Sequence, residues 1–548
     1  MTRYSIISRT LCAFAAACCC TACMDVDNSL GANLVPSGQN YSIYYTEKPI
    51  TEIRLAMTDG LSGYSPSRFT VGVVKDPDFG TTTRSCALTL VPLFSESLDL
   101  GKDPVFHSFH FTAVKEATHC PDESQSNILQ HFNVYELSKP LDFQKDFDCN
   151  MTVEHNEESI SEDYILYNGK DSLSFNFTRE FGEKYLRMTN DDVRDMDDYL
   201  KKFPGIYIEA DTADGSRYGR INMFNLQLGF NGESQTVTGN FAILNFNSSF
   251  EGVRKDTSLL FYFSATDFYK IDSLLTYSGT GNFPQYGLNL TSQSTRSLAG
   301  SPVGRTIPIE GGGGIKPVIS ARHLKNMAEE EIIRNGGNPS EAIINKASLV
   351  FPFEFPADYK EVDNRWPEYL SPTVKVRTDT NASFVGLTDS SSETENPGNI
   401  NRSLCRYAPD ITYHMQRILG IDEKDSGAEM TKMLNDGSFD IWFLIMATET
   451  ITTTNSVDQA TSEYYNYLAY QNYYNNMYGG YGGYGGYGDS YSNYYNYMMM
   501  SAYANQSNTT TTSSVMLDIS RFYKASLNGP GSDNAPRLEL TYSLPNKD

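Results

Sequence analysis

The chain has 548 residues, with 43 basic and 67 acidic side chains and a formal net charge of −24. This balance disfavours nucleic-acid binding, because affinity for phosphate comes mostly from clustered lysine and arginine. The length exceeds what one ordinary hydrophobic core organises, so we expect two or three domains.

The first 22 residues have the pattern of a secretory signal peptide. Arg3 and Arg9 precede an apolar run over residues 10–22 that is too short to cross a bilayer as a stable helix. The stretch Cys20-Thr21-Ala22-Cys23 resembles the bacterial lipobox. It implies cleavage between Ala22 and Cys23 and a covalent diacylglycerol or acyl lipid on Cys23, with no other cofactor. Cys20 stands where the lipobox usually has leucine, and cleavage without lipidation is the alternative.

Acidic residues follow the proposed lipid site at once. Asp25 and Asp27 resemble the short signal that sends lipoproteins of Bacteroidota to the outer face of the outer membrane. Acyl chains alone can anchor a soluble body, since each buried methylene contributes about 0.8 kcal/mol. We therefore expect a lipid-anchored linker over residues 23–40 and an outer-membrane protein that faces the cell exterior.

Alternation of apolar and polar residues with a period of two dominates the remaining chain, which is typical of half-buried strands. It is clearest at residues 345–353 and 537–544, whereas residues 440–446 are apolar on both faces, as in a central strand. This predicts a mainly β fold of two antiparallel β-sandwich domains, jelly-roll or immunoglobulin-like. Four glycines at 311–314 suggest the boundary, with an N-terminal domain over 41–310 and a C-terminal domain over 315–548.

Only a few short helices are predicted. Ser320 can cap a helix that ends near Gly336, Asn190 can cap a second helix, and a third can run from Asp410 to Gly420.

A low-complexity loop interrupts the second domain. Residues 464–503 hold 15 of the 37 tyrosines, the repeat YGGYGGYGGYG and one charged residue, Asp489. Glycine adds chain entropy and the pattern has no helical or strand period, so we expect a disordered insertion. The alternative is an adhesive loop, because tyrosine offers large amphipathic area at small entropic cost. Its candidate contact residues are Tyr478, Tyr481, Tyr484 and Tyr487.

Five phrases along the mature chain form a recognisable series. Leu30 to Pro36 comes first, and the second and most specific is Val71-Gly72-Val73-Val74-Lys75-Asp76-Pro77-Asp78-Phe79-Gly80-Thr81-Thr82. Val134 to Leu137, Phe203 to Ile208 and Ile344 to Leu349 follow. Together, and in this order, they resemble a Bacteroidota lipoprotein family catalogued as domain of unknown function 4270. The resemblance implies a surface partner of outer-membrane β-barrel machinery and carries no catalytic residue. Physically, the Asp76 to Gly80 segment predicts a tight turn, and two carboxylates are too few for calcium.

No motif of an enzyme or metal site is recognisable: GxSxG, HExxH and a phosphate-binding loop are absent. Cys86, Cys120, Cys149 and Cys405 are too widely spaced for a zinc site, and a Cys120 to Cys149 disulfide is as plausible as buried thiols. Trp366, followed by proline, is the candidate for stacking on a sugar.

These features favour a non-enzymatic, surface-exposed outer-membrane lipoprotein that binds a β-barrel protein complex and supports its assembly or export work. A glycan-binding or adhesive lipoprotein is the alternative, and a hydrolase the third hypothesis. Fold and compartment follow more directly from such a sequence than activity does.

Overall fold

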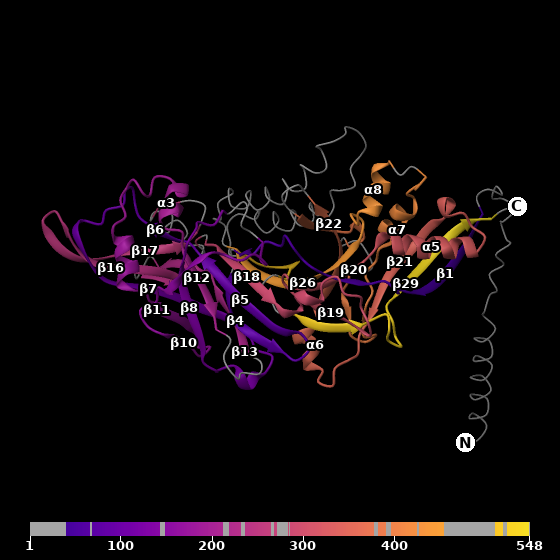
Figure 1. Cartoon of the computed structure of the whole chain (residues 1–548), viewed down its shortest axis with the longest axis horizontal. Helices are drawn as coiled ribbons and strands as arrows, with labels where there is room; N and C mark the ends of the chain where they lie inside the picture. Colours follow the sequence, from indigo (N-terminus) through magenta and orange to yellow (C-terminus); the bar gives the residue numbers. More distant parts are fainter. Residues whose placement is uncertain are drawn as a thin grey trace, which may run out of the picture.

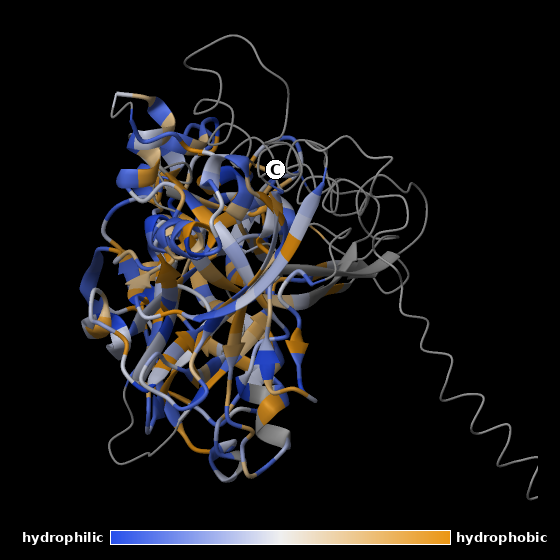
Figure 2. Cartoon of the chain, turned by 90° about the vertical axis from the view of Figure 1, so that its right-hand side faces the viewer, coloured by the Kyte–Doolittle hydropathy of each residue, from blue (hydrophilic) through white to orange (hydrophobic). Residues whose placement is uncertain are grey.

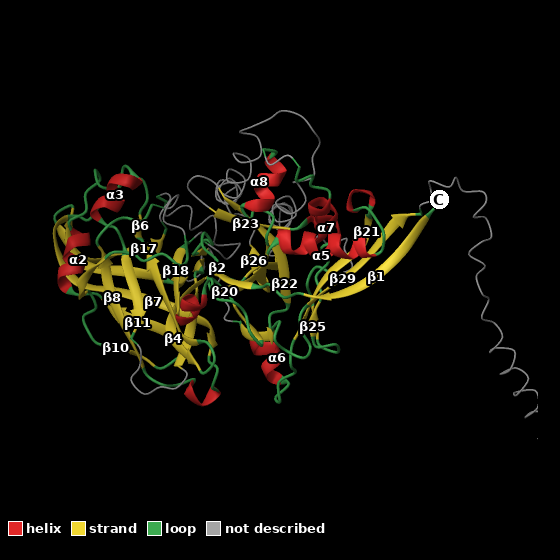
Figure 3. Ribbon diagram, turned by 45° about the vertical axis from the view of Figure 1, so that its right-hand side comes forward, coloured by secondary structure: helices red, strands yellow, loops and turns green. Residues whose placement is uncertain are grey.

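The computed structural model describes residues 40–65, 68–142, 148–211, 219–231, 236–264, 268–270, 283, 285–377, 382–390, 396–424, 427–453, 510–518 and 523–546. Over these residues the protein consists mainly of antiparallel sheets with short helices between strands (Figures 1 and 3). The predicted mainly β fold class is confirmed.

One large sheet system, which we call the N-terminal half, is built from residues 64–293. Its main path runs β10 (Ile165–Tyr167), β8 (Gln130–Leu137), β12 (Ile206–Ala210), β5 (Gly80–Leu88), β4 (Arg68–Asp76), β13 (Gly219–Asn225), β7 (Lys102–His119), β16 (Phe241–Phe250), β17 (Val253–Phe263) and β6 (Leu90–Leu93). Beside this path lie β3 (Tyr64–Ser65), β9 (His155–Ser159), β11 (Ser172–Asn176) and β18 (Gly287–Gln293), and β14 (Leu228–Asn231) pairs with β15 (Thr236–Gly239).

Strand β7 joins the two layers of this half. Its N-terminal part pairs with β11 and β16, and its C-terminal part pairs with β13. Phe69 and Val134 from one layer share a core with Phe109 and Phe261 from the other, and all four side chains have no exposed surface. Burial of such side chains, at about 1.5–3 kcal/mol each, is the main force that holds the layers together.

The C-terminal half contains three sheets. The first has the order β1 (Tyr41–Pro49), β29 (Arg537–Pro545), β21 (Ile343–Pro352), β25 (Arg406–Tyr407) and β24 (Ile400–Asn401). The second has the order β2 (Arg54–Met57), β20 (Ile315–Ile319), β26 (Ile441–Thr453), β22 (Tyr369–Arg377) and β23 (Ala382–Gly386), with β27 (Thr510–Leu517) beside β26. The third pairs β19 (Thr306–Glu310) with β28 (Lys524–Asn528). Leu349 and Leu540 pack with Ile441 and Phe443 in one core.

Six short α-helices lie among the described residues. They are α2 (Arg179–Leu186), α3 (Met196–Lys202), α5 (Ala321–Arg334), α6 (Lys360–Arg365), α7 (Thr412–Leu419) and α8 (Glu429–Asn435). The helices expected after Ser320 and after Asp410 are α5 and α7. The expected cap at Asn190 is wrong: its amide side chain bonds to the backbone of Leu98, and Asp195 caps α3 through Asp198 N.

The division of the chain differs from the predicted boundary. Strands β1 and β2 belong to the first expected domain, yet they pair with β29 and β20 of the second. Residues 311–314, which we expected to be a linker, form a buried turn between β19 and β20. Gly312 is left-handed at φ +59°, and a Cβ there would lie 2.6 Å from Arg84 Nη2. These glycines are needed for close packing at the junction between the two halves, not for flexibility.

Candidate functional site

Most residues to which the sequence assigns a function lie outside the described part of the chain. These are Ala22, Cys23, Asp25 and Asp27 near the N-terminus, and Tyr478, Tyr481, Tyr484 and Tyr487 in the tyrosine-rich loop. Lipidation, surface export and contact by the loop therefore stay predictions. In the sequence, the first described strand begins soon after the proposed lipid site: Tyr41, the first residue of β1, is 18 positions after Cys23.

Trp366 caps the C-terminal end of α6, and its ring is half-buried. It packs against the core of the C-terminal half, with its ring centroid 5.7 Å from that of Phe353. The indole Nε1 is buried without a hydrogen-bond partner among the residues that the structure describes. Sugar stacking on Trp366 stays a prediction.

The Asp76 to Gly80 turn is built as the sequence predicts. Asp76 Oδ1 accepts hydrogen bonds from the backbone N–H groups of Asp78 and Phe79 at 2.9 and 3.1 Å, and Gly80 has φ +70°. Asp76 Oδ2 lies 3.3 Å from Arg365 Nη2, so the turn of β4 and β5 is tied to helix α6 in the other half. The Asp76 to Gly80 turn thus lies at the junction between the halves.

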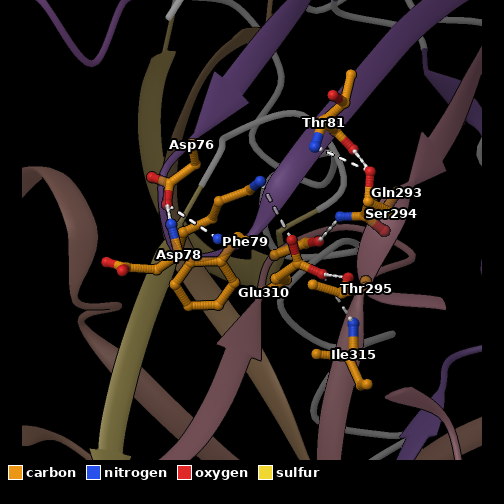
Figure 4. A network of polar contacts seen from close by, with 12 residues as sticks. Asp76, Asp78, Phe79, Thr81, Gln293, Ser294, Thr295, Glu310 and Ile315 are labelled. Atoms are coloured by element: carbon orange, nitrogen blue, oxygen red, sulfur yellow. Dashed lines mark hydrogen bonds and ion pairs between the residues drawn. The ribbon is translucent and has the colours of Figure 1, made fainter. Parts of the chain in front are cut away.

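A group of buried charged side chains lies at this junction, and Figure 4 shows one of them, Glu310, beside Thr295 and Ile315. We call the group the junction cluster, and its members, each 0–3% exposed, are Arg84, Glu310, Lys316, Asp518 and Lys524. Glu310 lies at its centre. The Thr295 hydroxyl and the Ile315 N–H donate to Glu310 Oε2, and Lys524 Nζ lies 3.3 Å from Oε1. Buried charges cost several kcal/mol each unless they are paired and hydrogen-bonded, and Glu310 is both, through Lys524 and through Thr295 and Ile315.

The glycine turn supplies the ligands of a second buried cation. Lys316 Nζ donates to three backbone carbonyls of the turn, those of Glu310, Gly312 and Gly314, the last two at 3.1 and 3.0 Å. Burial lowers the pKa of Lys316 to about 8, although Glu310 and Asp518 oppose that shift. The turn therefore acts as a cradle of carbonyl dipoles for an ammonium group.

Segments distant in the sequence meet at this turn. The N–H groups of Gly311 and Gly312 donate to the carbonyls of Tyr523 and Asp518 at 2.8 and 2.7 Å. From the other half, the Gln293 side chain donates to Gly311 O at 3.4 Å. Desolvation also lowers the pKa of Arg84, which comes from β5. In chemical terms the cluster is an electrostatic lock that is closed to solvent. Four of its charges belong to the C-terminal half, and Arg84 of the N-terminal half interacts electrostatically with Glu310 and Asp518.

Two titratable groups near the cluster are held in their neutral forms. Burial lowers the pKa of His119 to about 4 and raises the pKa of Cys149 to about 12. Cys149 is therefore a thiol, not a reactive thiolate, near neutral pH. No disulfide joins Cys86, Cys120, Cys149 or Cys405 within the described part of the chain.

An aromatic face is exposed where strand β8 and the residues flanking β10 and β12 lie beside one another in the N-terminal half. The Tyr164 ring, 68% exposed, lies parallel to His131 at a centroid distance of 3.6 Å. His131 Nδ1 lies 2.7 Å from Asp211 Oδ2, and Asn133 Nδ2 donates to Asp211 Oδ1 at 2.7 Å. Tyr164 thus presents a supported ring beside a fixed carboxylate and amide, which suits a ligand with both apolar faces and hydroxyl groups.

Sequence reasoning missed both the junction cluster and the Tyr164 face. Members of the cluster come from residues 84 to 524, and isolated charges in an acidic chain carry no signal of burial. One available signal was the run of four glycines directly before Ile315 and Lys316, because consecutive glycines can mark a close approach of backbone segments as well as a linker.

Neither a membrane-spanning helix nor a metal-binding cluster is found among the described residues. The described helices include none with the length and apolar character needed to span a bilayer. Nor does the described part of the chain bring together three or more His, Cys, Asp or Glu side chains in a way that could hold a metal ion. Comparison with family models, curated proteins and solved structures finds no match to this chain.

Proposed function

We propose that the protein is a non-enzymatic lipoprotein, anchored through Cys23 to the outer face of the outer membrane, that binds a β-barrel protein complex and supports its assembly or export. The observation that carries the proposal is the arrangement of the N-terminus. A signal-peptide pattern ends at Ala22-Cys23, and a regular strand of the folded body begins at Tyr41. The 18 positions from Cys23 to Tyr41 span at most about 60 Å in any conformation, which keeps the body beside the membrane.

Mass spectrometry of the mature N-terminal peptide tests the anchor. We expect an acylated Cys23, and we expect Cys23→Ala to release the chain from outer-membrane fractions. Asp25→Asn with Asp27→Asn should keep the lipid but reduce cleavage by protease added to intact cells. An unmodified N-terminus in the wild type would contradict the anchor.

The binding role has its own test. After depletion of the protein, quantitative proteomics of the outer membrane should show a loss of β-barrel proteins. An unchanged set of barrels, with the wild-type protein confirmed on the cell surface, would contradict the role in assembly or export while leaving the anchor intact.

The exposed Tyr164 face favours a second candidate function, binding of a surface glycan. Tyr164 supplies an open ring face, and Asp211 with Asn133 supplies hydrogen-bonding groups next to it. Glycan arrays probed with the wild type and with Tyr164→Ala test it, because loss of a stacking ring should cost about 1 kcal/mol, or roughly fivefold in affinity. Tyr359→Ala, which removes another 68% exposed tyrosine in the other half, is the matched control.

A further inference from the structure

Strand β1 is the edge of its sheet. Across residues 41–49 it pairs with β29 in an unbroken antiparallel register, from Tyr41 opposite Pro545 to Pro49 opposite Arg537. Within the described part of the chain, no strand pairs with its other side. Nine residues therefore present a regular open edge, with backbone donors and acceptors available to another strand.

In an ordinary half-buried strand the apolar side chains lie on the inner face, but in β1 several of them lie on the outer face. The inner face carries Ser42, Tyr44, Thr46 and Lys48. Of these, Tyr44 stacks on Tyr542 at 5.5 Å and Lys48 pairs with Glu331 of α5 at 2.5 Å. The outer face begins with Tyr41, Ile43 and Tyr45, which are 47, 72 and 62% exposed.

A fourth apolar residue extends this outer face across the sheet. Ile43 lies opposite Ser543 of β29, and Ser543 lies opposite Ile343 of β21, which is 46% exposed. We call Tyr41, Ile43, Tyr45 and Ile343 the β1 tip face. Strand β1 lies at the end of the molecule that carries the C-terminus, which is the end turned toward the viewer in Figure 2. An apolar outer face beside an open edge marks a surface built for a partner.

Three kinds of partner can be compared by whether each would pair with the backbone groups of the β1 edge and cover the apolar side chains of the tip face. A second copy paired edge to edge through β1 would satisfy the backbone but would double the uncovered apolar face. A lipid surface would cover the apolar side chains but would leave the edge N–H and C=O groups without partners, at a cost of several kcal/mol per group in hydrocarbon. An extended strand of a protein that has a larger apolar surface would pair with the backbone edge and also cover the apolar side chains.

We propose that the β1 edge and tip face dock an extended β segment of a protein resident in the outer membrane, by addition of a strand to the sheet. This inference rests on the proposed lipid anchor, because 18 positions separate Cys23 from Tyr41. Even fully extended, that tether spans only about 60 Å, so the tip face stays within reach of membrane-embedded partners.

Photo-crosslinking in intact cells tests the docking. A benzophenone amino acid at position 45 should form an adduct with an integral outer-membrane protein, and Ile43→Lys should reduce the adduct at least tenfold. The matched control is Val253, another exposed strand residue, 58% exposed on β17 at the opposite end of the molecule in Figure 1. Val253→Lys should leave the adduct at position 45 unchanged, and a crosslinker at position 253 should not capture the same protein.

Other outcomes overturn the proposal. Adducts only with lipid, only with a second copy of this chain, or with no molecule would each exclude a docked protein strand. So would an adduct that Ile43→Lys leaves intact. Acylation of Cys23 and surface exposure, measured on the same cells, separate this failure from failure of the proposed function. Equal melting temperatures of the two lysine variants would show that the loss does not come from unfolding.

Discussion

Replacing Glu310 with glutamine should destabilise the protein by about 3–5 kcal/mol, the usual cost of removing one partner from a buried ion pair. The Glu310 side chain has no exposed surface and lies 3.3 Å from Lys524 Nζ. Glutamine keeps the shape but leaves the buried ammonium groups of Lys316 and Lys524 with one carboxylate fewer. The midpoint of urea unfolding, followed by near-ultraviolet circular dichroism on a chain that starts at residue 24, measures the effect.

A surface pair provides the control for Glu310→Gln. Glu154 pairs with Lys139 at 2.6 Å, but both side chains are about two-thirds exposed, at 66 and 68%. Glu154→Gln should therefore cost roughly 0–1 kcal/mol. Adding Lys524→Met to Glu310→Gln should recover at least about 1 kcal/mol, because the two charges are coupled. Equal stabilities of the two glutamine variants would refute the electrostatic lock.

Three further measurements follow from buried groups. Burial lowers the pKa of Lys316 to about 8 in the folded state, so between about pH 8 and 10.5 the unfolded state binds more protons than the folded state. The free energy of unfolding of the wild type, relative to that of Lys316→Met, should therefore increase over this pH range in urea titrations. Burial lowers the pKa of His414 to about 4, so its contribution to stability should be lost as the pH falls from about 6.5 to 4, and His414→Gln should be less acid-sensitive in thermal melts. Gly312→Ala should lower stability by about 1–3 kcal/mol more than Gly300→Ala, because both glycines are left-handed but only Gly312 has Arg84 against its Cβ position; equal losses would exclude a role for that contact.

Local pattern was enough to predict many strands but not their partners. Alternating residues in β21 and β29, and the continuous apolar run in β26, each mark a strand because burial on one or two faces leaves a direct record in the sequence. Pairing leaves no such record. Tyr41 and Pro545 are register partners from opposite ends of the chain, so the predicted boundary placed β1 in the wrong half.

The candidate sites were predictable to different degrees. The Asp76 to Gly80 turn is local chemistry, and proline, aspartate and glycine specify it within five residues. Glu310 and Arg84 belong to no local pattern, since their burial depends on contacts made only after distant segments meet. The sequence Tyr-Ser-Ile-Tyr-Tyr places large side chains on both faces of β1, and only the contacts of Tyr44 and Lys48 show which face is packed.

The tether and the contacts between the halves together determine which surfaces can meet the membrane. The ion pair between Asp76 and Arg365 joins the two halves, so acylation of Cys23 would hold the β1 tip face near the bilayer and leave the Tyr164 face in the more distant half (Figure 1). A docked protein strand and a bound glycan would then occupy opposite ends of the molecule. Each should be lost independently: Ile43→Lys should spare glycan binding and Tyr164→Ala should spare the crosslink at position 45. Loss of both functions in either variant would show that the two surfaces are coupled, contrary to this arrangement.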